Sequence, residues 1–172
     1  MFFMADPAVL LAIGTAAVTA FPEQPSPARD GIRFTDATNS SGLNFQQSYG
    51  DRHLDNIVEG TGAGVCVFDY NNDGFLDVYF PNGKWTEGLS DDESRGLRGK
   101  LTNHLFRNNG DGTFTDVTEQ AGLGGSRYSA GCAAADYDND GNVDLLVLNY
   151  GQNELFHNDG NGRILSLWLC QI

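Results

Sequence analysis

Two acidic nonapeptides are the residues of this chain best suited to chemistry. "DYNNDGFLD" runs from Asp69 to Asp77, and "DYDNDGNVD" runs from Asp136 to Asp144. Carboxylates packed this densely repel one another unless a positive charge lies between them. Their oxygen side chains recur at positions 1, 3, 5 and 9, and alternate residues of a tightly curled loop can converge on one point. The spacing therefore predicts a cation site in each loop.

The oxygen donors and the turn residues point to calcium. The predicted side-chain ligands are Asp69, Asn71, Asp73 and Asp77 in the first loop and Asp136, Asp138, Asp140 and Asp144 in the second. Position 6 is Gly74 or Gly141, where the chain must turn sharply. Position 7 varies freely, Phe75 against Asn142, as expected if only its backbone carbonyl faces the ion. Hard oxygen ligands without nearby soft ones favour Ca²⁺ over zinc or copper. Asp, Asn and Gly can also mark plain β-turns, but two matching copies favour two calcium sites.

The loops do not fit an EF-hand. That loop closes with a bidentate Glu at position 12 and is followed by a helix. Position 12 here is Phe80 or Val147, within apolar runs typical of strands.

Each nonapeptide belongs to a longer repeat. Residues 62–80 align with residues 129–147 at an offset of 67, and "NHLFRNNGDGTF" aligns with "NELFHNDGNGRI" at an offset of 50. The difference between the offsets is an insertion of 17 residues in the first copy, within "NGKWTEGLSDDESRGLRGK", which we interpret as a polar surface loop. The repeats span residues 34–163, and residues 164–172 depart from the pattern as an apolar tail, which suggests a truncated chain.

The elements that must position the loops are short strands. "GVCVF", "DVYFP" and "DLLVLNY" are β-branched and aromatic runs bounded by Gly and Asn. "NNGDGT" and "NDGNG" suit tight hairpin turns with positive φ. Apart from one turn near Thr118 to Ala121, helical periodicity is absent. Roughly four short strands per repeat predict an all-β chain made of β-propeller blades.

Charge and the N-terminal residues bear on location. A formal net charge of −13 over 172 residues disfavours nucleic acid and anionic membranes as partners. The apolar run Val9 to Val18, followed by Thr19 and Ala20, predicts a signal peptide over residues 1–20 and a linker over 21–33, although Asp6 replaces the usual basic residues. The run is too short to span a membrane. We expect a secreted, periplasmic or cell-surface protein; the alternative is a buried or amphipathic N-terminal segment.

The cysteine pattern does not predict a disulfide framework or a zinc site. Cys66, Cys132 and Cys170 are odd in number and widely spaced. Alignment of the repeats places Cys66 and Cys132 one position apart, so they should lie on opposite faces of equivalent strands. We interpret them as small buried apolar residues, and whether any of them pair stays open.

"GAGVCVFDYNNDGFLDVYFPNG", "LFRNNGDGTFTDVTEQAGL" and "GCAAADYDNDGNVDLLVLNY" together resemble the FG-GAP/VCBS repeat family. They are particularly similar to bacterial relatives of cartilage acidic protein, which carry an ASPIC/UnbV domain downstream. The resemblance implies integrin-α-like propeller blades, calcium in a loop between strands, and the ligands named above, the carbonyls of Phe75 and Asn142 included. It also implies exported proteins that mostly bind rather than catalyse. Only two blades are found, so the propeller is incomplete and its edges could drive self-association.

Binding is the predicted function, to an unidentified protein or glycan, as in adhesion. No catalytic group stands out: "RYSAG" (Arg127 to Gly131) only approaches a nucleophile motif. The three histidines are interpreted as surface or turn residues, and Glu59 as a solvated carboxylate. The alternatives are the propeller part of a larger secreted enzyme, for example one acting on polysaccharide, and a non-functional truncated product.

Overall fold

The strands form two antiparallel sheets of four. The computed structural model describes residues 34–54, 56–125, 127–162 and 164–170. The chain divides into two units, Met1–Thr35 and Asp36–Ile172, and every element below belongs to the second. The first sheet contains β1 (Cys66–Phe68), β2 (Asp77–Phe80), β3 (His104–Asn108) and β4 (Phe114–Asp116). The second contains β5 (Ser129–Ala135), β6 (Asp144–Asn149), β7 (Asn153–Asn158) and β8 (Ile164–Cys170).

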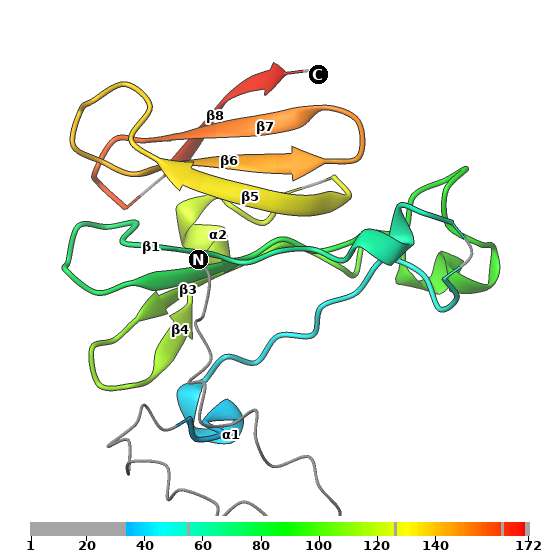
Figure 1. Cartoon of the computed structure of the whole chain (residues 1–172), viewed down its shortest axis with the longest axis horizontal. Helices are drawn as coiled ribbons and strands as arrows, with labels where there is room; N and C mark the ends of the chain where they lie inside the picture. Colours follow the sequence, from blue (N-terminus) through cyan, green and yellow to red (C-terminus); the bar gives the residue numbers. More distant parts are fainter. Residues whose placement is uncertain (1–33, 55, 126, 163, 171–172) are drawn as a thin grey trace, which may run out of the picture. The chain divides into compact units, whose positions relative to one another are not determined.

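Each sheet is a simple meander. Strands that are neighbours in the sequence are neighbours in the sheet, and every pairing is antiparallel. Figure 1 shows the two sheets lying one above the other, with the short helix α2 (Thr118–Ala121) between them. The predicted all-β class is confirmed, and the two sheets have the form of two propeller blades.

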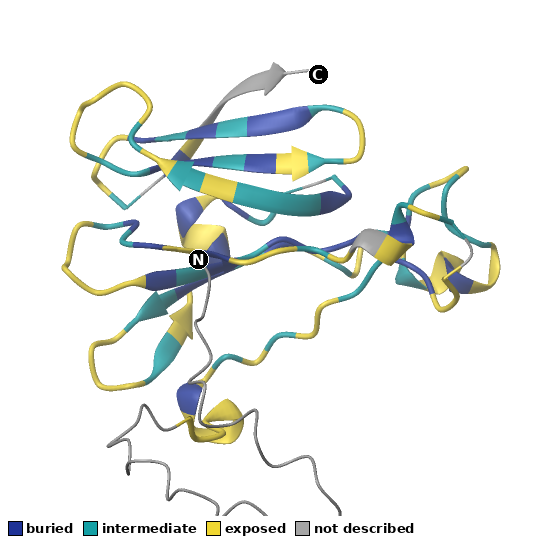
Figure 2. Cartoon of the chain, viewed as in Figure 1, coloured by how far each residue is buried: buried dark blue, intermediate teal, exposed yellow. Residues whose placement is uncertain are grey.

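The core lies between the sheets. Cys66 in β1 pairs with Tyr79 in β2, and Tyr79 pairs with Leu105 in β3, so the three side chains share one face of the first sheet. They are buried against Leu145 and Val147, which project from β6 of the second sheet. The residue between Cys66 and Phe68 faces the other way: Val67 is 54% exposed. Figure 2 shows this alternation of buried and exposed positions along the strands.

A disulfide joins the two blades. Cys66 in β1 is bonded to Cys132 in β5, with 6.0 Å between their Cα atoms. The predicted burial is confirmed for Cys66, and Cys132 packs against the same core, while the pairing that the sequence left open is present. Their positions on opposite faces of equivalent strands are what allow the bond, because stacked blades turn opposite faces toward each other. Cys66 lies on the face of the first blade that meets the second, and Cys132 on the face of the second that meets the first.

The predicted turns are present. α2 begins at Thr118, whose hydroxyl accepts a hydrogen bond from the Leu105 amide and so ties the helix to β3. The connections β3–β4 and β7–β8 contain Gly110, Gly112, Gly160 and Gly162, all with positive φ. Positive φ is what tight hairpin turns require. Residues 164–170, set apart in the sequence as an atypical tail, form β8 and pair along the whole of β7.

The insertion forms an organised lobe. It contains the 3₁₀ helix η3 (Glu93–Leu97) and the buried side chain of Trp85, whose indole N–H donates to the Asp91 carbonyl at 2.8 Å. The lobe closes on Asp51, a buried carboxylate that accepts hydrogen bonds from the Ser94 hydroxyl and the Asp91 amide. Most residues of the insertion are exposed or half-buried, as expected of a surface loop, and these contacts give it a defined internal structure. Two further short helices, α1 (Thr38–Ser41) and η2 (Glu59–Thr61), precede β1.

Within the described part of the chain, no helix has the length and apolar character needed to cross a membrane. The signal peptide and linker predicted for residues 1–33 lie outside the described residues.

Candidate functional site

The two nonapeptides form the hairpin loops between the first two strands of each blade. In the first loop, the Asp69 carboxylate accepts the backbone amides of Asp73 (3.1 Å) and Gly74 (2.8 Å). The Asp73 carboxylate accepts the Phe75 amide at 2.9 Å. Asn72 and Gly74 take positive φ values of 58° and 88°, which curl the chain around its own carboxylates.

The second loop repeats these bonds atom for atom. The Asp136 carboxylate accepts the amides of Asp140 (3.2 Å) and Gly141 (3.0 Å), and Asp140 accepts the Asn142 amide at 2.8 Å. Asn139 and Gly141 have φ values of 59° and 91°. The same backbone path therefore forms in both copies, although Phe75 and Asn142 have nothing chemical in common.

The last carboxylate of each loop is buried and ties the loop to the blade. Asp77 is 0% exposed, and its two oxygens accept the amides of Tyr70 (3.0 Å) and Asn108 (2.7 Å). Asp144 is 1% exposed and accepts the amides of Tyr137 (3.0 Å) and Asn158 (2.8 Å). Each of these carboxylates joins the start of its loop to the end of the third strand.

The side chain at position 7 points toward the neighbouring turn. A Cβ at Gly110 would lie 2.7 Å from the Phe75 ring, and a Cβ at Gly160 would lie 2.5 Å from the Asn142 amide oxygen. Glycine is thus required at positions 110 and 160, because the side chain at position 7 of each acidic loop comes too close to leave room for a Cβ atom. Because the side chain at position 7 packs against the turn, its chemical type can differ between the two copies.

The carboxylates of the second loop lie close enough to share one ion. Ligand atoms of Asp136, Asp138 and Asp144 all fall within 4.8 Å of one another, as do those of Asp138, Asp140 and His157. In the first loop Asn71 stands where Asp138 stands in the second. Each carboxylate oxygen has two lone pairs, so an oxygen that accepts one amide can still bind a cation.

His157 borders the second loop. Its Nδ1 atom is 3.4 Å from an Asp138 oxygen and 3.2 Å from an Asp144 oxygen, yet it is buried and makes no hydrogen bond. At the aligned position the first blade carries Arg107. The interpretation of His157 as an ordinary surface or turn residue is therefore wrong. Its buried Nδ1 atom and the neighbouring oxygens of Asp138 and Asp144 have the arrangement that a shared cation would use.

The exposed and buried carboxylates of the loops differ in acidity. The Phe75 amide and the Asn71 side chain hold the pKa of Asp73 below its ordinary value of 3.8. The Asn142 amide and side chain likewise lower the pKa of Asp140. Burial raises the pKa of Asp77 above 3.8 despite its two amide hydrogen bonds, and the charges of Asp73 and Asp69 add to the increase. A cation beside Asp77 would offset this cost of ionisation.

The two loops lie next to each other. The Asn72 side chain donates to the Asn142 side chain at 2.6 Å, and the Asn158 side chain donates to the Tyr70 carbonyl at 2.7 Å. The Asn158 side chain also donates a hydrogen bond to the Val143 carbonyl at 3.1 Å. The candidate sites are therefore coupled through hydrogen bonds between the blades.

Other residues considered in the sequence lie elsewhere. Ser129 of the "RYSAG" stretch is 0% exposed in β5 and donates to the Asn149 side chain. Glu59, expected to be solvated, is 2% exposed, because η2 turns it inward. His53 lies near Asp91 and Glu93 on the insertion lobe, but the His53 and Glu93 side chains are mostly exposed. We do not propose a metal site at these exposed side chains.

Comparison with known proteins supports the fold. A family model described as "FG-GAP-like repeat" matches residues 91–147 and 136–169. Residues 91–169 of the chain therefore match FG-GAP-like repeats. They imply a β-propeller-like module, in agreement with the two four-stranded sheets. The chain is also similar to cartilage acidic protein 1 of Xenopus tropicalis, with 38% identity over 65 residues. That match covers 36% of this chain and 10% of the relative's length.

Proposed function

We propose that the chain is a calcium-stabilised, β-propeller-like binding module of an exported protein. The observation that carries the proposal is the repeated loop, in which the same residues make the same hydrogen bonds in both blades. Two unrelated β-turns rich in Asp, Asn and Gly would have no reason to place the same set of oxygen atoms toward the inside of the loop. A cation site needs this arrangement.

Electrostatics gives calcium its role. Carboxylate oxygens within 4.8 Å of one another repel by on the order of 1–3 kcal/mol per pair between water-like and surface-like dielectric constants. Seven carboxylates divide between the two loops. A divalent ion in each would replace repulsion by attraction and fix the turn that pairs the first two strands of each blade. The ligands would be Asp69, Asn71, Asp73, Asp77 and the Phe75 carbonyl in one loop, and Asp136, Asp138, Asp140, Asp144 and the Asn142 carbonyl in the other.

The two sites would differ in one donor. His157 brings a buried nitrogen to the second loop, whereas Arg107 of the first loop cannot donate a lone pair. Imidazole nitrogen is a ligand that divalent transition metals accept more readily than calcium does. The first site is thus suited to calcium alone, and the second to calcium and to manganese or zinc.

The disulfide supports export. Cys66 and Cys132 are joined within the core, and disulfides persist in oxidising compartments such as the periplasm and the extracellular space. Adhesion to a protein or glycan is the role we assign to the exported module, with the calcium sites structural.

Calcium titration of the full-length chain tests the proposal. Calorimetry should give two ions per chain, and thermal melts should rise with Ca²⁺, since a ligand at 100 times its dissociation constant adds about 2.7 kcal/mol per site. Asp73→Ala and Asp140→Ala should each remove one ion. Asp111→Ala, in the exposed β3–β4 turn, is the matched control and should retain two. Unchanged stoichiometry and affinity in both loop variants would overturn the ligand assignment.

A further inference from the structure

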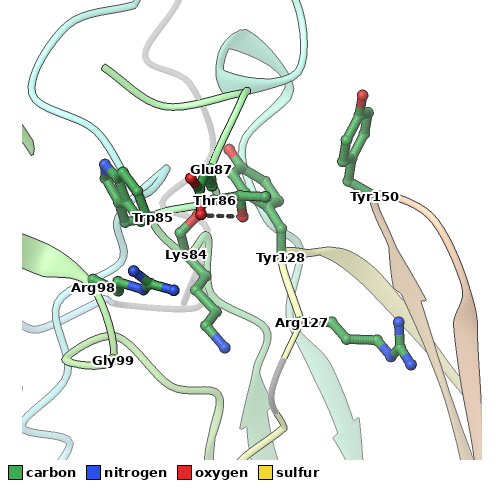
Figure 3. Close-up of a pocket in the computed structure, with 9 residues that line it drawn as sticks. All are labelled: Lys84, Trp85, Thr86, Glu87, Arg98, Gly99, Arg127, Tyr128 and Tyr150. Carbon is green, nitrogen blue, oxygen red and sulfur yellow. Dashed lines mark hydrogen bonds between the residues drawn. The ribbon is translucent and has the colours of Figure 1, made fainter. Parts of the chain in front are cut away.

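A pocket lies at the end of the sheets remote from the calcium loops. Asp77 and Asp144 begin β2 and β6 at the loop end. The pocket is lined instead by residues 84–87, which follow β2, by residues 127 and 128, which precede β5, and by Tyr150, which follows β6. Its volume is about 460 Å³, within the range of small-molecule sites. Figure 3 shows the side chains around it.

The pocket concentrates positive charge in an acidic protein. Lys84, Arg98 and Arg127 line it together with one acid, Glu87. Three of the ten Lys and Arg residues of a chain with net charge −13 therefore meet in one place. A locally positive cavity on an acidic molecule selects for anions, because cations are drawn to the rest of the surface.

The arginines are held in position. The Arg98 guanidinium lies over the ring of the buried Trp85, 5.5 Å from its centroid, and within the described residues no carboxylate pairs with it. Arg127 is fixed by Glu154 at 3.6 Å and by the Gln152 side chain at 3.3 Å. Pre-oriented guanidinium groups suit a planar carboxylate, which they bind with paired hydrogen bonds.

Aromatic and hydrogen-bonding groups complete the pocket. Tyr150 is 54% exposed at the rim and offers a flat apolar face beside the cations. Burial, with the charges of Glu59 and Asp51, raises the pKa of Tyr128 to about 12, so its hydroxyl stays a neutral donor. Glu87 and Thr86 can accept hydrogen bonds from hydroxyl groups. An anion that also has a ring face and hydroxyl groups would use all of these features.

We propose that this pocket binds an acidic sugar, a uronate unit whose carboxylate meets Arg98 and Lys84 while its ring packs on Tyr150. The inference rests on the proposed binding function and names its ligand class. An acidic peptide could also use a cluster of basic side chains, but a peptide carboxylate brings neither a ring face for Tyr150 nor hydroxyl groups for Thr86 and Glu87.

Calorimetric titration of the full-length, calcium-loaded chain with a galacturonate disaccharide tests the proposal. Wild type should bind it and should not bind the corresponding neutral galactose disaccharide. Arg98→Gln and Tyr150→Ala should each weaken binding about tenfold or more, as expected for loss of a charge-assisted hydrogen bond or a packed ring. Lys100→Gln removes the same charge two residues away from Arg98, does not line the pocket, and should bind like wild type.

The other outcomes separate the proposals. Equal binding of tetra-aspartate or inorganic sulfate would show a general anion site and overturn the sugar assignment. Absence of disaccharide binding in a sample that takes up two Ca²⁺ ions would overturn the pocket proposal and leave the calcium proposal standing. Disaccharide binding without calcium uptake would overturn the calcium proposal and leave the pocket proposal standing. Thermal melts of each variant establish that it is folded before its affinity is compared.

Discussion

Removal of the Cys66–Cys132 bond should cost the protein a large part of its stability. The bond closes a loop with a sequence separation of 66 residues. In the chain-entropy description, opening a loop of that length lowers the free energy of unfolding by about 4 kcal/mol at 25 °C. Domains are typically stable by about 5–15 kcal/mol. The reduced protein is therefore expected to have a small free energy of unfolding. Within the described residues, reduction leaves the backbone as the only covalent connection between the two blades.

Two measurements test this expectation. Thiol titration of the denatured, unreduced chain should find one reactive thiol among the three cysteines, and three after reduction. Urea denaturation of Cys66→Ala/Cys132→Ala should give a midpoint well below that of wild type and unaffected by reductant. Cys170→Ser is the matched control: it should keep the wild-type midpoint and its sensitivity to reductant. Three thiols before reduction would show that the bond is absent. A change below 1 kcal/mol on reduction would refute the loop-closure reasoning.

Three further predictions concern charged side chains. Asp144→Asn deprives one of two buried amides of its acceptor and should lower the free energy of unfolding by about 1–3 kcal/mol in urea. Asp92→Asn, on an exposed pair, should change it by no more than about 0.5 kcal/mol, and equal losses would contradict the role of burial. Burial opposes ionisation of Asp51, but hydrogen bonds from Ser94 and neighbouring amides outweigh it and hold the pKa below 3.8. Asp51 thus stabilises the fold above pH 3.8 and loses this contribution as the pH falls through its folded pKa. Acid melts of Asp51→Asn should decline less steeply than those of wild type, and parallel curves would exclude this linkage. Finally, pulsed EPR of Mn²⁺-loaded wild type should show a coupled nitrogen that is lost in His157→Arg and doubled in Arg107→His, while both variants still bind two Ca²⁺ ions. A nitrogen signal that persists in His157→Arg would assign it to another residue.

The loops and turns were predictable because their geometry is local. Nine residues specify each acidic loop, and the glycines needed for positive φ lie inside it, so two aligned copies are enough to predict the path. Short runs of β-branched and aromatic residues bounded by Gly and Asn predicted the strands for the same reason. The helix at Thr118 and the hairpin turns were also predicted from short stretches of sequence, although the close approach of Phe75 and Asn142 to the turn glycines was not.

What the sequence could not give depends on how the blades stack. The disulfide requires Cys66 and Cys132 to lie on facing sides of adjacent blades, and their one-position offset in the repeat was the signal for it. His157 approaches the second loop from β7, so its role follows from strand pairing rather than from its immediate neighbours. Glu59 is buried where the chain before η2 is tied to the insertion lobe: Asn56 accepts the Glu59 amide and donates to the Leu89 carbonyl.

The placement of charge reconciles an acidic protein with an anion-binding pocket. Strand β6 has six residues, starting at Asp144 in the second acidic loop and ending just before Tyr150 at the pocket. At about 3.3 Å per residue the two ends are roughly 20 Å apart, more than twice the screening length of about 8 Å at physiological ionic strength. The carboxylates of the loops therefore exert little repulsion on a ligand in the pocket, and bound calcium would reduce it further. Binding of an acidic sugar should accordingly depend strongly on salt through Arg98 and Lys84, and only weakly on whether the calcium sites are filled, so long as the blades stay folded.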